Sequence, residues 1–285
     1  MEHNLLLKLQ QNEFSEYIIY KKLALISKKK EYREILEKIA EEELRHYNFF
    51  KGITQKDTKQ NNFKVFIYLF LSRSLGLNFA LKLMEKGESL APGIYEEIKA
   101  SIPQIEKIIG DEKKHESELI SLINEEHLRY ISSMVLGLND ALVELTAALV
   151  GFSFALQNTR LIAIVGLITG ISASMSMSAS EYLSTKQEDT EKSPIKASIY
   201  TGFAYILTVL ILVLPYFFFK NLFLALGSVI TSAILIIFIF NFYISITKEL
   251  NFRKRFLEMF GLSLSVALIN FAIGLIIRRV FKIDI

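Results

Sequence analysis

Two short motifs in the sequence combine a carboxylate and an imidazole at a fixed spacing. Glu43 and His46 form one Glu-x-x-His motif, and Glu112 and His115 form a second. Residues three apart lie on one face of a helix, so the carboxylate and the imidazole of each motif can reach the same metal ion. Two irons need several oxygen ligands and one nitrogen each, which two such motifs begin to supply. The pair therefore predicts a di-iron site, and it uses half of the four histidines in the chain.

A di-metal site of this kind also needs one glutamate from each of two further helices. The first expected helix offers Glu13, with Glu16 as a competing choice ranked below it. The third offers Glu85 and Glu88. The full set of expected ligands is Glu13, Glu43, His46, Glu85, Glu88, Glu112 and His115. The remaining glutamates of these helices are expected to be solvated surface charges: Glu41, Glu42, Glu96, Glu97, Glu116 and Glu118.

Carboxylates also occur within two long apolar segments farther along the chain. Asp140 and Glu144 stand four residues apart in the segment 131–155, with apolar residues on both sides. Helical spacing places both carboxyls on one face. The next segment carries Met177, whose thioether binds soft or borderline metals, and it closes on Glu181. A carboxylate at membrane depth is costly unless it is paired, hydrated or metal-bound, so Asp140 and Glu144 predict an ion path. Glu181 and Met177 are expected to belong to the same path, the alternatives being an acid at the aqueous end of the span for Glu181 and packing for Met177.

Helices must position the Glu-x-x-His motifs. Apolar residues recur at helical spacing in four stretches of the N-terminal half: 4–28, 30–50, 63–90 and 103–127. A polar loop covers 54–62, and Ala91-Pro92-Gly93 is expected to end the third helix. The sequence shows no strand pattern. We therefore predict an all-α fold in which residues 1–128 form a ferritin-like four-helix bundle.

The second half of the chain is predicted to be a five-helix transmembrane domain, residues 129–285. A helix needs about 20 apolar residues to cross a bilayer, and five runs qualify: 131–155, 161–184, 196–219, 221–246 and 258–280. The loops 185–195 and 247–257 carry lysines and arginines, which favours their placement in the cytosol. Because both loops fall on the N-terminal side of the membrane, the bundle is expected to be cytosolic too.

Small residues recur every four positions along the second span. They are Gly166, Gly170, Ser174 and Ser178. Such a stripe lets another helix approach closely. The partner helix belongs either to the same subunit or to the second copy in a dimer.

The composition excludes several other classes of site. The chain has no cysteine, which excludes disulfides, thiolate metal sites, iron–sulfur clusters and cysteine nucleophiles. Its formal charge of +3 is small and dispersed, so nucleic acid is not an expected partner. The first 30 residues lack the basic start and apolar core of a secretory signal. The N-terminal half is therefore expected to stay in the cytosol.

The N-terminal half resembles a ferritin-like domain of the rubrerythrin type over about residues 4–127. In that family the first helix has a glutamate seven residues before a tyrosine, matched by Glu13 and Tyr20. The third helix has Glu-x-x-Glu, matched by Glu85 and Glu88. The resemblance implies iron in a di-iron site. Rubrerythrins append a four-cysteine iron centre that delivers electrons, which this chain cannot build, and this argues against rubrerythrin-type peroxidase turnover.

The C-terminal half is similar to the vacuolar iron transporter (VIT) family. The first span of that family reads close to Gly-x-x-Asp-Gly, and residues 137–141 match it with alanine for the second glycine. The second span ends near Ser-Met-x-x-Gly-Glu-Tyr-x-Ser, and residues 176–184 match it with serine for glycine. The similarity implies five spans, a homodimer in membrane lipid, and Fe²⁺ or Mn²⁺ exchanged for protons along a path lined by Asp140 and Met177.

These patterns together predict a transporter that exports Fe²⁺ or Mn²⁺ from the cytosol in exchange for protons. The expected location is the cell membrane of a prokaryote, with the N-terminal bundle in the cytosol capturing or sensing iron. The alternative is a membrane-anchored di-iron oxidase, in which the bundle performs ferroxidase chemistry and the spans are a tether. A tether needs neither five spans nor intramembrane acids, so the pattern favours transport.

Overall fold

The computed structural model describes residues 2–99, 101–122, 125–188, 192–248 and 250–281. Within these ranges every regular element is helical, which confirms the all-α fold class. The chain divides into two compact units, Met1–Asn124 and Glu125–Ile285.

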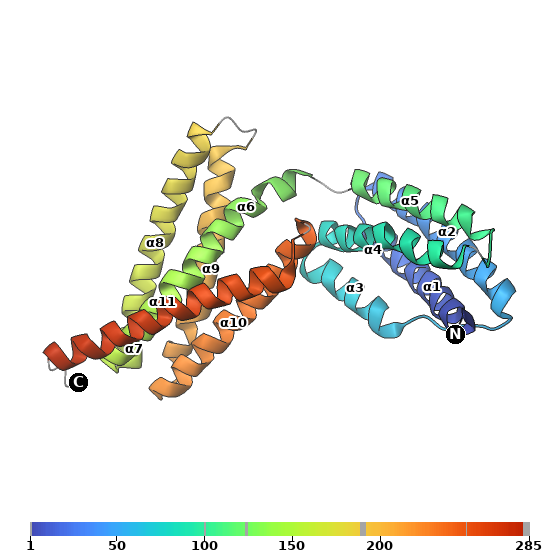
Figure 1. Cartoon of the computed structure of the whole chain (residues 1–285). Helices are drawn as coiled ribbons and strands as arrows, with labels where there is room; N and C mark the ends of the chain where they lie inside the picture. The colour runs from blue at the N-terminus through green and yellow to red at the C-terminus, as the bar shows by residue number, and fades with distance from the viewer. Residues whose placement is uncertain (1, 100, 123–124, 189–191, 249, 282–285) are drawn as a thin grey trace. The chain divides into compact units, whose positions relative to one another are not determined.

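Helices α1 to α5 make up the described part of the first unit (Figure 1): α1 (Glu2–Ile26), α2 (Lys30–Thr54), α3 (Asn62–Ser74), α4 (Leu77–Ile98) and α5 (Ile105–Leu122). Helix α1 packs along α2, α4 packs along α5, and α3 packs on α1. An apolar core lies between them and is filled by Leu6, Leu9, Phe50, Tyr95, Ile98, Ile105, Ile108 and Ile109. Glu13 of α1, Glu43 and His46 of α2, and Glu112 and His115 of α5 are buried within this unit.

The third predicted helix, 63–90, is two helices in the structure, and the predicted break at Ala91-Pro92-Gly93 is wrong. The chain turns instead at Gly76, whose φ of +92° is accessible to glycine because it has no Cβ atom. Helix α4 then continues through Pro92 to Ile98. A proline inside a helix costs about 3 kcal/mol. Burial of Tyr95 and Ile98 in the core offsets this cost, at roughly 1.5–3 kcal/mol for each large apolar side chain.

The second unit contains five helical stretches, among the described residues, that are long and apolar enough to cross a membrane. They are Tyr130–Leu156, Thr159–Gln187, Pro194–Phe218, Leu222–Thr247 and Phe252–Phe281. The first comprises part of α6 (Glu125–Asp140), a π-helical turn η1 (Ala141–Leu145) and α7 (Thr146–Leu156); the others are α8, α9, α10 and α11 in order. The number of these candidate spans agrees with the prediction. Their boundaries agree with the prediction within a few residues, except that α11 begins six residues before position 258.

The small-residue stripe of α8 is used for packing within the subunit. Gly166, Gly170 and Ser174 are buried, and a Cβ atom on Gly170 would lie 2.6 Å from the side chain of Val209 on α9. The Ser174 hydroxyl donates a hydrogen bond to the backbone oxygen of Gly202 at 3.1 Å. Of the two roles left open by the sequence, the structure thus assigns the stripe to close contact between α8 and α9.

Candidate metal-binding sites

Four side chains from three helices meet in the interior of the first unit. Glu13 of α1, Glu43 and His46 of α2, and Glu112 of α5 each offer one ligand atom, and these atoms all lie within 4.8 Å of one another. None of the four residues is more than 4% exposed. Ligand atoms at about 2.1 Å from one ion are roughly 3–4 Å apart. A small inward movement of these side chains would therefore bring all four to coordination distance.

The charges in this cluster favour a cation. His46 Nδ1 lies 3.2 Å from Glu13, 3.6 Å from Glu112 and 3.7 Å from Glu43. Burial alone would lower the pKa of His46, but the hydrogen bonds and charges of Glu13 and Glu43 outweigh it and raise this pKa from 6.5 to about 10. Burial likewise opposes ionisation of Glu13, yet the hydrogen bond and charge of His46 lower the pKa of Glu13. Without metal, a proton on His46 therefore balances part of the carboxylate charge.

A divalent metal ion fits this donor set. Each buried carboxylate costs several kcal/mol unless it is compensated, and one imidazolium cannot balance three carboxylates. Carboxylate and imidazole ligands suit Fe²⁺ and Mn²⁺. Glu13, Glu43, His46 and Glu112 would hold the ion, and bound iron would supply Lewis acidity and redox chemistry there. The structure thus brings four of the expected ligands into one metal-binding group.

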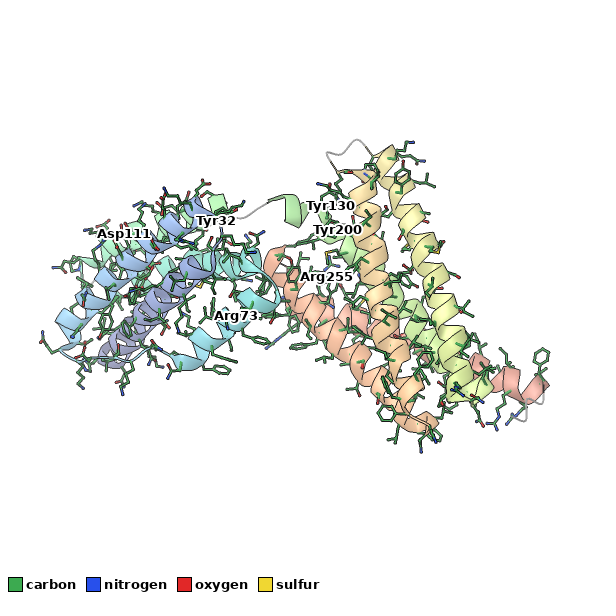
Figure 2. All side chains as sticks on the ribbon, turned by 180° about the vertical axis from the view of Figure 1, so that it is seen from behind. Tyr32, Arg73, Asp111, Tyr130, Tyr200 and Arg255 are labelled. Carbon is green, nitrogen blue, oxygen red and sulfur yellow. The ribbon has the colours of Figure 1, made fainter. Side chains whose placement is uncertain are left out.

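The Nε2 atom of each histidine contacts a carboxylate on the helix that carries the other motif. His46 Nε2 lies 3.2 Å from Asp111, and His115 Nε2 lies 2.7 Å from Glu42. Asp111, which is labelled in Figure 2, and Glu42 each directly precede the glutamate of their own motif. A carboxylate at Nε2 makes this nitrogen the N–H donor and turns Nδ1 toward the ligand cluster. Neither contact was predicted from the sequence.

The expectation that Glu42 is a solvated surface charge is wrong. Glu42 is only 8% exposed, because the packing of α2 against α5 directs it onto His115. Burial would raise the pKa of Glu42, but the hydrogen bond and charge of His115 and the charges of Lys114 and Lys38 lower it. Glu42 is therefore an anion that orients His115.

We expect Glu42→Ala to weaken metal binding through His115 by about 10- to 100-fold, the usual effect of losing a partner that orients a metal ligand. The adjacent change Glu41→Ala is the matched control, because Glu41 is exposed on the same helix. Metal titration of both variants in the full-length protein checks this. Equal affinities for the two variants would contradict the orienting role of Glu42.

Of the other predicted ligands of the bundle, His115 lies beside this four-residue group. His115 Nδ1 is 3.0 Å from Glu43, which places His115 where a second ion sharing Glu43 would bind. Glu85 on α4 is buried and forms an ion pair with Lys82 at 2.8 Å. The side chain of Glu88 lies outside the described part of the structure.

Helix α1 presents its two candidate glutamates to different partners. Glu13 enters the metal-binding group and accepts a hydrogen bond from the buried hydroxyl of Tyr95. Glu16 forms an ion pair with Lys64 of α3 at 2.7 Å. Tyr20 is fully buried. Tyr95 was missed in the sequence, because no spacing relates it to Glu13, from which it is 82 residues distant.

The first span departs from α-helical geometry at the two acids predicted to line the path. Residues Ala141–Leu145 form a single π-helical turn between α6 and α7. Such turns are rare and occur often at functional sites. Asp140 directly precedes the turn and is half-buried, whereas Glu144 lies within it and is exposed. The π turn thus coincides with the pair of carboxylates that the sequence marks as ion ligands.

Tyr205 of α9 adds a hydroxyl to this region. It is fully buried and donates a hydrogen bond to Glu144 at 3.2 Å. The bond fixes the position of the Glu144 carboxyl relative to α9. Sequence reasoning missed Tyr205, because a tyrosine in an apolar span is ordinarily a packing residue and the chain has 12 tyrosines.

Glu181 and Met177 extend this region along α8. Ser133 of the first span donates a hydrogen bond to Glu181 at 2.6 Å. Ser133 precedes Asp140 by seven residues, so the contact with Glu181 is about 10 Å from Asp140 along the first span. Met177 is half-buried and packs against the apolar core of the unit. Glu181 therefore lies toward one end of the spans, and the Asp140–Glu144 pair lies deeper.

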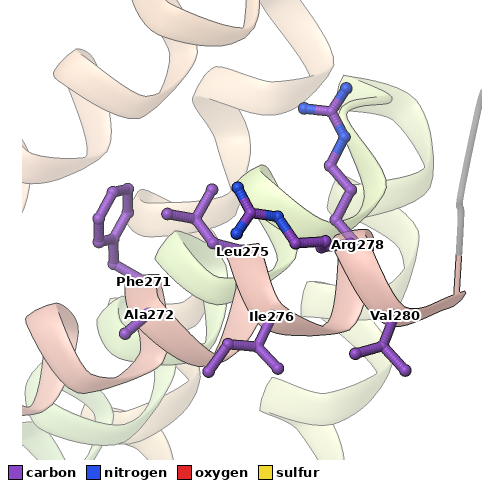
Figure 3. Close-up of a pocket in the computed structure, with 7 residues that line it drawn as sticks. Phe271, Ala272, Leu275, Ile276, Arg278 and Val280 are labelled. Atoms are coloured by element: carbon purple, nitrogen blue, oxygen red, sulfur yellow. The ribbon is translucent and has the colours of Figure 1, made fainter.

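Two other hollows in the second unit lack carboxylates. One, of about 750 Å³, follows the last turns of α11, and Figure 3 shows its lining, which comes from this helix alone. It is a surface groove beside Arg278 and Arg279. The other, of about 350 Å³, lies among α7, α10 and α11 and is apolar apart from Thr146 and Ser263. Neither lining offers the oxygen ligands that a desolvated divalent cation needs.

Comparison with protein families indicates the class of the second unit. Residues 131–192 match the VIT family. The matched stretch contains Asp140, Glu144, Met177 and Glu181. Neither a search of curated proteins nor a search of solved structures gives a match. The match to the VIT family and the five apolar helices indicate an integral membrane protein.

Proposed function

We propose that the protein exports Fe²⁺ or Mn²⁺ from the cytosol in exchange for protons. One observation carries this proposal: the stretch that matches the VIT family holds all four residues predicted for the ion path. The proposal places the protein in the cell membrane of a prokaryote as a homodimer. Helix α11, which buries the least of the five spans, leaves apolar surface for lipid or for a second copy.

The path residues have the chemistry that this exchange needs. Glu181, hydrogen-bonded by Ser133, would receive the cation at the cytosolic end, and Asp140 and Glu144 would bind it where it loses water. The thioether of Met177 favours transition metals over Mg²⁺ and Ca²⁺. A carboxylate uses the same lone pairs for a metal and for a proton, so departure of the metal favours protonation. Exchange of one for the other follows from this competition.

For the first unit we propose a rubrerythrin-type, ferritin-like di-iron bundle in the cytosol. The buried group of Glu13, Glu43, His46 and Glu112 supports one ion, and His115 beside Glu43 supports a second. Such a bundle would capture iron, or sense it, at concentrations below those that fill the path. Its ligands come from α1, α2 and α5, so metal binding would also stabilise the packing of these helices.

The second candidate function is a membrane-anchored ferroxidase. The observation that favours it is the same buried donor set, because carboxylates with one imidazole per ion suit oxygen chemistry as well as capture. The two functions differ in a measurable way. An oxidase consumes O₂ as Fe²⁺ is supplied and moves no metal across the membrane.

Flux into sealed proteoliposomes tests the proposal. For protein molecules whose cytosolic side faces outward, we expect anaerobic Fe²⁺ to enter the lumen while the luminal pH rises, because protons leave as metal enters. Mg²⁺ should produce neither signal, and protein-free vesicles supply the background. Metal entry without a pH change would exclude proton exchange. In a parallel assay with O₂ present, O₂ consumption together with no anaerobic metal entry would establish the oxidase instead.

A further inference from the structure

Helix α3 is apolar on nearly all sides. Its sequence, NFKVFIYLFLSRS, has eight apolar side chains in the nine positions from 63 to 71, interrupted only by Lys64. A helix that is apolar all round is normally buried in a protein core or in a membrane. Helix α3 is not one of the helices that supply the metal-binding group, so its composition needs a separate explanation.

One edge of α3 is fixed to the bundle by specific contacts. Lys64 forms its ion pair with Glu16 of α1, and Val65 is buried. The side chain of Asn61 caps the helix by accepting from the backbone amides of residues 63 and 64. The backbone amide of Asn61 donates in turn to the Ser15 hydroxyl at 2.8 Å. These contacts set the rotation of α3 about its own axis.

That rotation leaves an aromatic face uncovered. Phe63, Phe66 and Phe70 are 72%, 63% and 55% exposed, and they lie at the spacing of one helix face. The rings of Phe66 and Phe70 stack with their centroids 6.0 Å apart, so they form a continuous surface. Three large aromatic side chains on one short helix are far more apolar surface than scattered exposed residues provide, and such a patch marks an interaction site.

The covalent structure of the chain keeps this unit close to a bilayer. Eight residue steps separate Leu122, the last residue of α5, from Tyr130, the first residue of the first candidate span. Even a fully extended chain of that length reaches at most about 30 Å. Helix α1, with 25 residues, is itself about 38 Å long. The end of α5 is therefore tethered within about 30 Å of the start of the first candidate span.

Cations stand before α3 and in its last turn, and the exposed anion between them, Asp57, is paired with Lys51. Lys56 and Lys59 precede α3, Arg73 is in its last turn, and all three are exposed. Phenylalanines on one face with cations beside them are typical of helices that lie in the membrane interface. We propose that α3 is such an interfacial helix and inserts Phe63, Phe66 and Phe70 into the headgroup–acyl boundary of the bilayer that holds the spans. The ion pair with Glu16 then fixes the metal-binding bundle to the membrane surface.

The absence of cysteine makes a direct test available. Phe66→Cys in the full-length protein creates a single thiol for an environment-sensitive fluorophore, and Ile120→Cys on α5, 50% exposed in the same unit, is the matched control. The protein is reconstituted in vesicles of phosphatidylglycerol and phosphatidylethanolamine with or without nitroxide-labelled lipid. We expect the nitroxide to quench the label at position 66 at least threefold more strongly than the label at position 120.

A second label at Phe63→Cys guards against a local effect of one substitution and should give the same result. Because both positions are exposed, neither change opens a cavity in the bundle. Equal, weak quenching at all three positions would overturn the proposal. A label at position 66 that is shielded from water but not quenched by nitroxide lipid would also overturn it, and would show that protein covers this face, such as a second copy of the chain.

Discussion

Asp140→Asn is expected to reduce Fe²⁺ flux by at least a hundredfold while the protein still inserts and assembles. Asparagine keeps the size and hydrogen bonding of the side chain but removes its charge and its ability to take up a proton. A unit charge 4 Å from another contributes about 4 kcal/mol at an effective dielectric constant of 20, and 1.4 kcal/mol is a factor of ten in binding. Losing one such interaction with a dehydrated divalent ion is therefore sufficient for the expected fall.

The control for this change is Glu144→Gln. The amide oxygen of glutamine can still accept the hydrogen bond of Tyr205, so the geometry at the π turn is retained. We expect a milder loss of flux if Glu144 mainly carries protons or supports Asp140. Membrane yield and dimer content are measured beside flux for both variants. A well-assembled Asp140→Asn protein with wild-type flux would exclude Asp140 from the path, and loss of assembly together with flux would make its role structural.

The membrane half was the more predictable part of the fold, for a physical reason. Each span satisfies its backbone hydrogen bonds within one helix, so it must appear in the sequence as one continuous apolar run. The starts of α8 and α10 are also marked locally, because the side chains of Asn158 and Asn221 accept hydrogen bonds from the first backbone amides of each helix. The π turn at Ala141–Leu145 carries no such mark, since its residues are ordinary helix formers.

In the first unit, the residue spacing along single helices predicts only part of the site. The spacing of each Glu-x-x-His motif fixes which residues share a face, and the structure brings Glu13, Glu43, His46 and Glu112 together. Contacts across helices depend on how one helix is rotated against another. Glu42 reaches His115 for this reason, although a glutamate in a charged helix is usually solvated.

The predicted end of the third helix was also wrong. The pattern placed a helix end at Pro92, the stronger helix breaker, whereas the chain turns at Gly76. Burial of residues beyond the proline, including Tyr95, stabilises the helix across Pro92. The sequence around the proline does not show that these residues are buried. Tyr95 and Tyr205 reach their glutamates across 82 and 61 residues of sequence, and no periodicity connects them.

His46→Ala is expected to remove one tight metal site from the bundle and, with it, the proton that is released on binding. In the metal-free protein the pKa of His46 is raised to about 10, so His46 is protonated at pH 7 and must lose this proton to coordinate a metal through nitrogen. Apparent affinity should therefore rise about tenfold per pH unit from pH 7 toward pH 10. Glu13, whose pKa is lowered, is already ionised there and adds no proton.

The same raised pKa of His46 should make the metal-free bundle less stable as the pH rises, whereas metal affinity increases. A folded-state pKa above the unfolded value of 6.5 stabilises the bundle fully below pH 6.5, and this contribution is lost as the pH rises through about 10. Metal binding should cancel that loss, because the cation replaces the proton between the carboxylates. Thermal unfolding at pH 6 and pH 9, with and without Mn²⁺, measures both effects.

The measurement is made on full-length protein carrying Asp140→Asn, which silences the membrane path, with His3→Ala as the control for loss of an exposed histidine. Calorimetric titration in buffers of different ionisation enthalpy counts the protons released per metal bound. We expect the His46 site to release about one proton per metal in the His3→Ala control. In His46→Ala this site should release none, and its metal affinity should be at least tenfold lower. Unchanged stoichiometry, affinity and proton release in His46→Ala would remove His46 from the site. The four-residue group would then be a buried ion-pair cluster that stabilises the bundle without binding metal.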